Sequence, residues 1–227
     1  MAQTVITIGY PVPDDFPAAD YNLIHTKMAR RSAESVFWEY GFAWNAVAYR
    51  FTQMADHDEA YRRTLTDSGD PYVARYKQDK ELFGFFMAGL SVLEAFFYAM
   101  HSVAGLADPI GFPMASESDL KRVDITLTED RFACRFPTEL LTQAMTSLVC
   151  DPSLERWKKV RNVLVHRQAP GRVVSVSSVG QAPPDKWKLE GLTLDTDLTS
   201  SRRGWLSQVL TSLMACGLEF VERHAGP

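Results

Sequence analysis

Hydrophobic residues recur at steps of three and four along most of the chain, the spacing that places side chains on one face of an α-helix. Residues 1–19 lack this pattern, and their prolines predict an extended N-terminal arm. The pattern changes from Asp20, and an apolar stripe through residues 33–54 predicts a long helix that ends near Leu65. The first half of the chain therefore begins as an arm followed by a core helix.

A second long helix is expected over residues 71–105. The sequence Ser68-Gly69-Asp70-Pro71 interrupts the first helix, and Pro71 suits the first turn of the next one. The later half of this second helix is apolar nearly all round, so we expect it to be central and covered on most sides.

The middle of the chain has weaker patterns. Residues 106–136 are rich in Gly, Pro, Asp and Ser and predict an irregular connection, with one helical turn near 117–123 and a short extended piece around 125–127. A short helix is expected to follow at 138–150.

The last third carries stronger signals. Asp151-Pro152 is an N-cap residue followed by a proline at the first helical position, which predicts a helix over 152–167. Residues 173–176 and 187–192 alternate and are β-branched or aromatic, so they predict a two-stranded excursion. A final amphipathic helix is expected over 199–223.

The composition fits a single globular domain. The chain has 227 residues, of which 46% are hydrophobic and 23% charged, values typical of folded proteins. We predict an all-α fold, an up-and-down bundle of four to five helices with a small β-hairpin excursion before the last helix, formed by residues 20–227.

Location and cofactors follow from what the chain lacks. The N-terminus has no basic flank or long apolar stretch, and Glu94 interrupts the most hydrophobic run, so we expect a cytoplasmic protein with no membrane segment. The three cysteines are widely separated and match neither a disulfide framework nor a zinc site. We therefore expect no metal and no cofactor.

One segment, residues 156–172, concentrates positive charge. It contains no acidic residue although the formal net charge of the protein is −4. Its cations are Arg156, Lys158, Lys159, Arg161, Arg167 and Arg172. Such a segment is either a solvated helix face or a phosphate-binding surface, and as phosphate-binding residues we single out Lys158, Lys159, Arg167 and Arg172.

Arg161 lies within the apolar stripe of its helix, where a charge requires a partner or a cleft. Glu94, equally misplaced in the apolar half of the second helix, is the expected partner. The pair would either hold two helices in register or orient the guanidinium towards a phosphate. Ser91, Tyr98 and His101 share the helix face of Glu94, and we predict supporting roles for Tyr98 and His101.

Asn162 and His166 are four residues apart and share a helix face next to Arg161. His166 stands in the last helical turn, where the negative end of the helix dipole favours the charged imidazolium and the neighbouring cations oppose it. A histidine that gives and takes protons, beside an arginine that neutralises a phosphate, suits cleavage of RNA by its own 2′-hydroxyl.

Arg161-Asn162, three apolar residues and His166 resemble the signature of the HEPN superfamily: an arginine, a polar residue and, after a short interval, a histidine. The helical frame is also similar, because GLSVLEAFFYAMHS looks like the acid-bearing earlier helix of that fold. The resemblance covers about residues 30–223, with the loop at 106–136 and the hairpin at 173–194 as elaborations.

The resemblance implies a metal-independent endoribonuclease of a toxin–antitoxin or phage-defence system, acting as a homodimer on RNA, with an antitoxin protein as a further partner. Arg161 would bind and polarise the phosphate, His166 would transfer the proton, Asn162 would position one of them, and Glu94 would hold Arg161. Two alternatives remain open: a non-catalytic HEPN-like nucleotide-binding, RNA-binding or dimerisation module, and an unrelated bundle in which the motif is accidental.

Overall fold

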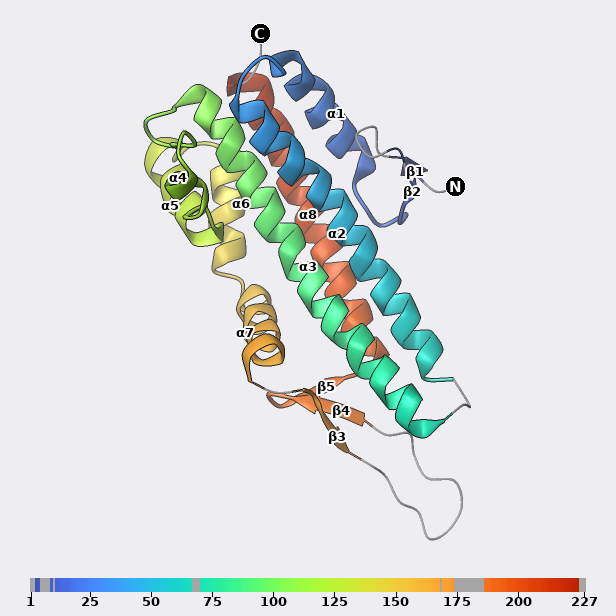
Figure 1. The fold of residues 1–227 in the computed structure, drawn as a ribbon. Coiled ribbons are helices and arrows are strands. Elements are labelled where there is room, and N and C mark those ends of the chain that lie inside the picture. Colours follow the sequence, from blue (N-terminus) through green and yellow to red (C-terminus); the bar gives the residue numbers. More distant parts are fainter. Residues whose placement is uncertain are drawn as a thin grey trace.

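The computed structural model of the chain is dominated by α-helices, with small antiparallel sheets, and it confirms the predicted helical fold with a small sheet before the last helix (Figure 1). The structure describes residues 3–4, 9, 11–66, 70–167, 169–173 and 186–224.

The N-terminal arm folds back on the bundle. Its strands β1 (Gln3–Thr4) and β2 (Pro11–Val12) pair antiparallel. Helix α1 (Ala18–Met28) follows at once and continues into a 3-10 turn (Ala29–Arg31), so a separate helix occupies the region just after the arm, where none was predicted. Tyr21 of this helix stacks on Trp44 with ring centroids 4.8 Å apart, which fixes α1 against the core.

Two long antiparallel helices form the centre of the bundle. Helix α2 (Val36–Thr64) and helix α3 (Pro71–Ala107) lie side by side, and α8 (Thr196–His224) packs against both of them (Figure 1). Helix α3 begins as predicted, because the side chain of Asp70 accepts a hydrogen bond from the amide of Tyr72 at 2.7 Å. Its apolar half is buried, which confirms that it is the central helix.

Three short helices follow α3. They are α4 (Glu117–Leu120), α5 (Ile125–Arg135) and α6 (Leu140–Val149), and α5 packs against α3. The helical turn near 117–123 and the helix at 138–150 were predicted, but the extended piece at 125–127 is wrong. Asp124 caps α5 by accepting a hydrogen bond from the amide of Leu127 at 2.7 Å, and this cap begins a helix there instead of a strand.

Helix α7 (Pro152–His166) begins where it was predicted, with Asp151 accepting a hydrogen bond from the amide of Ser153 at 2.7 Å. An antiparallel sheet of three described strands, β3 (Gly171–Val173), β4 (Lys186–Leu189) and β5 (Leu192–Leu194), follows in place of two strands. The expected strand at 187–192 is broken in two, because Glu190 and Gly191 have φ of 49° and 76° and form a tight turn. Residues 174–176 of the predicted hairpin lie outside the described residues.

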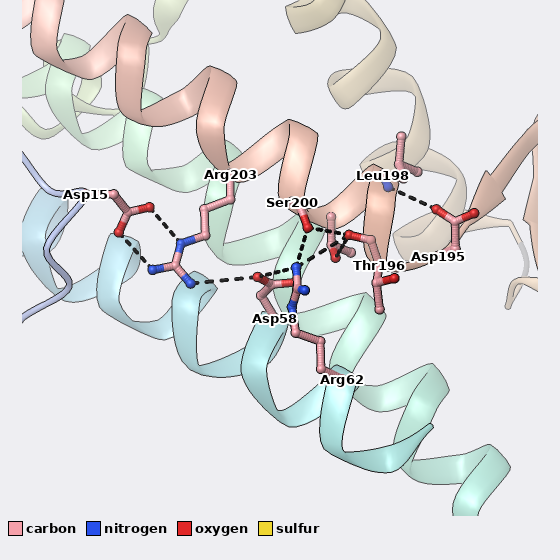
Figure 2. A network of polar contacts seen from close by, with 9 residues as sticks. Asp15, Asp58, Arg62, Asp195, Thr196, Leu198, Ser200 and Arg203 are labelled. Atoms are coloured by element: carbon pink, nitrogen blue, oxygen red, sulfur yellow. Dashed lines mark hydrogen bonds and ion pairs between the residues drawn. The ribbon is translucent and has the colours of Figure 1, made fainter. Parts of the chain in front are cut away.

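A network of charged side chains ties α8 to α2 and to the N-terminal segment (Figure 2). Arg203 of α8 contacts Asp15 through two nitrogens at 2.7 and 2.8 Å, and its third nitrogen lies 3.7 Å from Asp58 of α2. Asp58 is 2% exposed and also accepts hydrogen bonds from Arg62, which donates in turn to Ser200. The network holds three distant parts of the sequence together.

Helices α3 and α8 are both long and apolar enough to cross a membrane by length and composition. The most apolar window is 61% buried inside the protein in α3 and 39% buried in α8. Burial of this kind is typical of a core helix. Length, composition and burial do not test insertion into a membrane, and the expectation that no segment enters one stays a prediction.

Candidate functional site

Trp157 anchors α7 against α3. Its indole nitrogen donates to the carbonyl of Phe86 at 3.0 Å, and its ring stacks on Phe85 with centroids 5.8 Å apart. The ring also lies directly over Gly89, where a Cβ would come 2.2 Å from a ring carbon. One turn later, Arg161 is therefore carried towards the side of α3 that bears Glu94.

Arg161 and Glu94 form the ion pair that the sequence predicts. The Nη2 atom of Arg161 donates to Oε1 of Glu94 at 2.6 Å, while Oε2 of Glu94 accepts from the hydroxyl of Ser91 at 3.2 Å. The side chains are 25% and 40% exposed. The guanidinium is thus held on one side by a carboxylate and still reaches solvent, the arrangement needed to meet an anion from outside.

Asn162 and His166 lie on the exposed side of α7. Within the part of the chain that the structure describes, the imidazole of His166 makes no hydrogen bond or ion pair. It stands in the last turn of α7, where the helix dipole favours a positive charge. Arg161 and His166 are about 140° apart on an ideal helix, so the two side chains of one protomer point in different directions.

The predicted phosphate-binding residues are dispersed. Lys158 is half-buried and Arg167 is exposed at the C-terminal cap of α7. Lys159 pairs with Glu190 of the β4–β5 turn at 3.0 Å, which leaves it less available to a ligand. Arg172 pairs through its backbone with Trp187, and its side chain lies outside the described residues.

The two supporting residues have partners other than Arg161. The hydroxyl of Tyr98 donates to Glu39 of α2 at 2.7 Å. Burial, reinforced by this hydrogen bond, raises the pKa of Tyr98 well above its usual value, so the phenol stays protonated. Tyr98 and Glu94 therefore share a face of α3 without forming one network.

His101 is buried beneath α5. Its Nδ1 lies 3.2 Å from the hydroxyl of Thr128 and its Nε2 lies 3.2 Å from a guanidinium nitrogen of Arg131. Burial, together with the positive charge of Arg131, lowers the pKa of His101 to about 4. The imidazole is thus neutral near pH 7, with Nε2 accepting from Arg131, and it serves to attach α5 to α3.

An open groove of about 510 Å³ lies beside the ion pair, between α2, α3 and the start of α5. Its polar lining residues are Glu39, Arg50, Glu94, Tyr98 and Asp124, and its apolar lining is formed by Phe42, Ala43, Ala46, Ala95 and Val123. Because Glu94 belongs both to the groove and to the pair with Arg161, anything bound in the groove touches the residue that orients the guanidinium.

Sequence reasoning missed a histidine–carboxylate contact between α2 and α3. The Nδ1 of His57 lies 2.6 Å from Oε2 of Glu81, and the ring rests on Gly84, where a Cβ would come 2.3 Å from Nε2. His57 and Glu81 are on different helices and follow no common spacing, so the sequence offered no signal for the pair. It lies more than two helical turns from Glu94 along α3.

The described residues include no group of three histidine, cysteine or acidic side chains placed to hold a metal ion. No protein-family model, curated protein or solved structure matches the chain. The functional reading of this site therefore depends on its residues and on the resemblance in sequence motif.

Proposed function

We propose that the protein is a metal-independent endoribonuclease of the HEPN type, a toxin or phage-defence effector whose site contains Arg161 and His166. The observation that carries the proposal is the partly exposed guanidinium of Arg161, which Glu94 of α3 holds at 2.6 Å. Arg161 lies on α7, whose last turn presents His166 to solvent. Phosphodiester cleavage by a 2′-hydroxyl requires at least a fixed cation and a proton-transfer group that meet at one phosphate.

In the proposed reaction His166 takes the proton from a ribose 2′-hydroxyl. The oxygen attacks the adjacent phosphorus, and Arg161 neutralises the negative charge that gathers on the phosphoryl oxygens. The bond from phosphorus to the 5′-oxygen then breaks, and this oxygen leaves with a proton from a second acid. The products are a 2′,3′-cyclic phosphate and a 5′-hydroxyl, so no water or oxidant is consumed.

A second copy of the chain would supply that acid. Because Arg161 and His166 of one protomer diverge by about 140°, they do not converge on one phosphate. In a two-fold dimer each arginine can meet the histidine of the other protomer, and the two imidazoles can act as base and acid. Asn162, on the same face as His166, would orient it or the substrate.

The test is cleavage of a labelled single-stranded RNA in EDTA. His166→Ala is expected to lower the cleavage rate by about a hundredfold or more, and Arg161→Ala by a similar factor. Arg30→Ala, which removes an exposed cation outside the site, is the matched control and should leave the rate unchanged. Cleavage by the His166→Ala protein at the wild-type rate would disprove the assignment.

Mixing two inactive variants tests whether the site is shared. Protomers with Arg161→Ala and protomers with His166→Ala form heterodimers that contain one intact arginine–histidine combination across the interface. In that heterodimer the second imidazole is missing, so after subunit exchange a partial return of activity is expected, at most about a quarter of the wild-type value. If both residues of one chain act together, mixing restores nothing.

The pairing of Arg161 with Glu94 inside one protomer also favours the alternative of a non-catalytic RNA-binding or nucleotide-binding module. Such a module would bind RNA and release it intact. Equal binding by wild type and His166→Ala, with no cyclic phosphate product from either, would establish the alternative.

A further inference from the structure

The groove of about 510 Å³ between α2, α3 and the start of α5 is hollow because small residues face it. Ala43 and Ala46 of α2 and Ala95 of α3 belong to its lining. The two helices pack along their length, and methyl groups at these positions leave the space that larger side chains would fill. Sites for small molecules typically have volumes of about 300–1,000 Å³. We call this hollow the acidic groove.

The acidic groove carries more negative than positive charge. Its lining includes the carboxylates of Glu39, Glu94 and Asp124 and the guanidinium of Arg50. With three negative charges and one positive, these groups sum to −2. Arg161 pairs with Glu94 from outside the lining and reduces the sum to −1. The complementary occupant is therefore a cation, and a phosphate would be repelled.

Two of the carboxylates have only neutral partners. The hydroxyl of Tyr98 donates to Oε2 of Glu39 at 2.7 Å, and the amide of Leu127 donates to Oδ1 of Asp124 at 2.7 Å. Within the described ranges of the chain, neither carboxylate forms an ion pair. The second oxygen of each is thus open to a charged donor from outside.

An aromatic ring borders the same groove. Phe42 is 69% exposed, and its ring centroid lies 6.3 Å from that of Trp38, one turn earlier on α2. The face of an aromatic ring attracts a cation, and an apolar stem gains by covering the ring. Arg50 does not occupy this position, because one of its nitrogens donates to the carbonyl of Ser91 at 3.0 Å. Carboxylates, a ring and alanine methyl groups together fit an ammonium group on an apolar stem.

We propose that the acidic groove binds a small organic amine, a primary ammonium on an aliphatic stem. The ammonium donates to the open oxygens of Glu39 or Asp124, and the stem covers Phe42 and the alanine side chains. A groove of this volume surrounds a small molecule, whereas a peptide segment would lie mostly outside it. The inference goes beyond the proposed nuclease and stands without it.

The test is calorimetric titration of the purified full-length chain with hexylamine, near neutral pH and in about 50 mM salt, where charges are only partly screened. The expected dissociation constant is below about 1 mM. Hexanoate has a stem of similar length and the opposite charge, and it should not bind. A dissociation constant above about 1 mM for hexylamine, or equal binding of hexanoate, would overturn the proposal.

Two substitutions remove charge from the groove and keep the local hydrogen bonds. In Glu39→Gln the amide oxygen still accepts from Tyr98, and in Asp124→Asn the side chain still caps α5. Each should raise the dissociation constant of hexylamine by about three- to tenfold. Asp56→Asn, an exposed position of α2 outside the lining, is the matched control and should leave it unchanged. Wild-type affinity in both groove variants would contradict the proposal.

Ala46→Leu fills the groove without changing its charge. Ala46 is half-buried and lines the hollow, so the added atoms enter the groove and the fold should survive, as circular dichroism would show. The dissociation constant should rise by more than about tenfold, because the stem loses its space. Wild-type affinity in this variant would place the amine elsewhere and refute the proposal. Binding of the peptide acetyl-Gly-Lys-Gly-amide without binding of hexylamine would also refute it, in favour of a docking site for a partner protein.

Discussion

Gly89 is the point at which the position of α7 is most sensitive to a single methyl group. In Gly89→Ala the new Cβ would lie 2.2 and 2.8 Å from two ring carbons of Trp157 and 3.1 Å from the sulfur of Met54. The indole has no room to retreat, because it is 1% exposed and is hydrogen-bonded to the Phe86 carbonyl at 3.0 Å. The substitution must therefore push α7 away from α3.

The expected loss follows from two opposing effects. Alanine in place of glycine favours the helix by about 1 kcal/mol, while overpacking a core costs about 1–3 kcal/mol and occasionally more. Since the contacts at Gly89 are so short, we expect a net loss of about 2 kcal/mol, or a decrease in Tm of roughly 4–8 °C. Displacement of α7 should also separate Arg161 from Glu94 and lower RNA cleavage.

Thermal unfolding followed by circular dichroism measures this change. Gly204→Ala on α8 is the control, because nothing lies within 4 Å of the added Cβ and the position is exposed. That variant should be more stable than wild type by about 0.5–1 kcal/mol. If Gly89→Ala melts at or above the wild-type temperature while Gly204→Ala shows its expected gain, the clash of the added Cβ with Trp157 does not limit the packing of α7.

Three further predictions concern charged groups. Burial and a neighbouring arginine lower the pKa of His101 to about 4. As the pH falls, the histidine is therefore protonated in the unfolded chain before it is protonated in the folded protein. The free energy of unfolding should drop by on the order of 3 kcal/mol between pH 6.5 and 4. His101→Gln should lack this part of the pH dependence in urea denaturation. A double-mutant cycle on Glu94 and Arg161 should give a coupling free energy of about 1 kcal/mol or less, because both side chains are partly exposed. A coupling free energy above about 2 kcal/mol would contradict this prediction. Asp58→Ala leaves two arginines without their buried carboxylate and should lower the free energy of unfolding by about 3 kcal/mol. Asp15→Ala, at the solvent-facing end of the same network, should lower it clearly less. Equal losses of stability in the two variants would show that burial of the carboxylate is not decisive.

Local patterns in the sequence predicted the main helices and their starts. The Asp-Pro pairs at 70–71 and 151–152 cap α3 and α7, because a short carboxylate and a proline satisfy the first turn of a helix without help from the rest of the fold. The pairing of Arg161 with Glu94 was also predicted, since a charge on an apolar stripe requires a partner and the second helix offered one misplaced acid.

The errors arose where distant residues or backbone conformation decide the structure. The separate helix α1 depends on the stacking of Tyr21 against Trp44, and α5 depends on a cap together with the burial of Phe132. The break between β4 and β5 depends on the positive φ of Glu190 and Gly191, which an alternating pattern does not reveal.

For the site, the sequence by itself determined the residue types and their order: a basic helix, an arginine on its apolar side, and a histidine in its last turn. Only the tertiary structure decided that Tyr98 pairs with Glu39, that His101 belongs to the attachment of α5, and that Glu94 lines an open groove between α2 and α3. The physical reason is that helical periodicity fixes which side chains share a face of one helix, whereas packing between helices fixes which faces meet and which remain open to a partner.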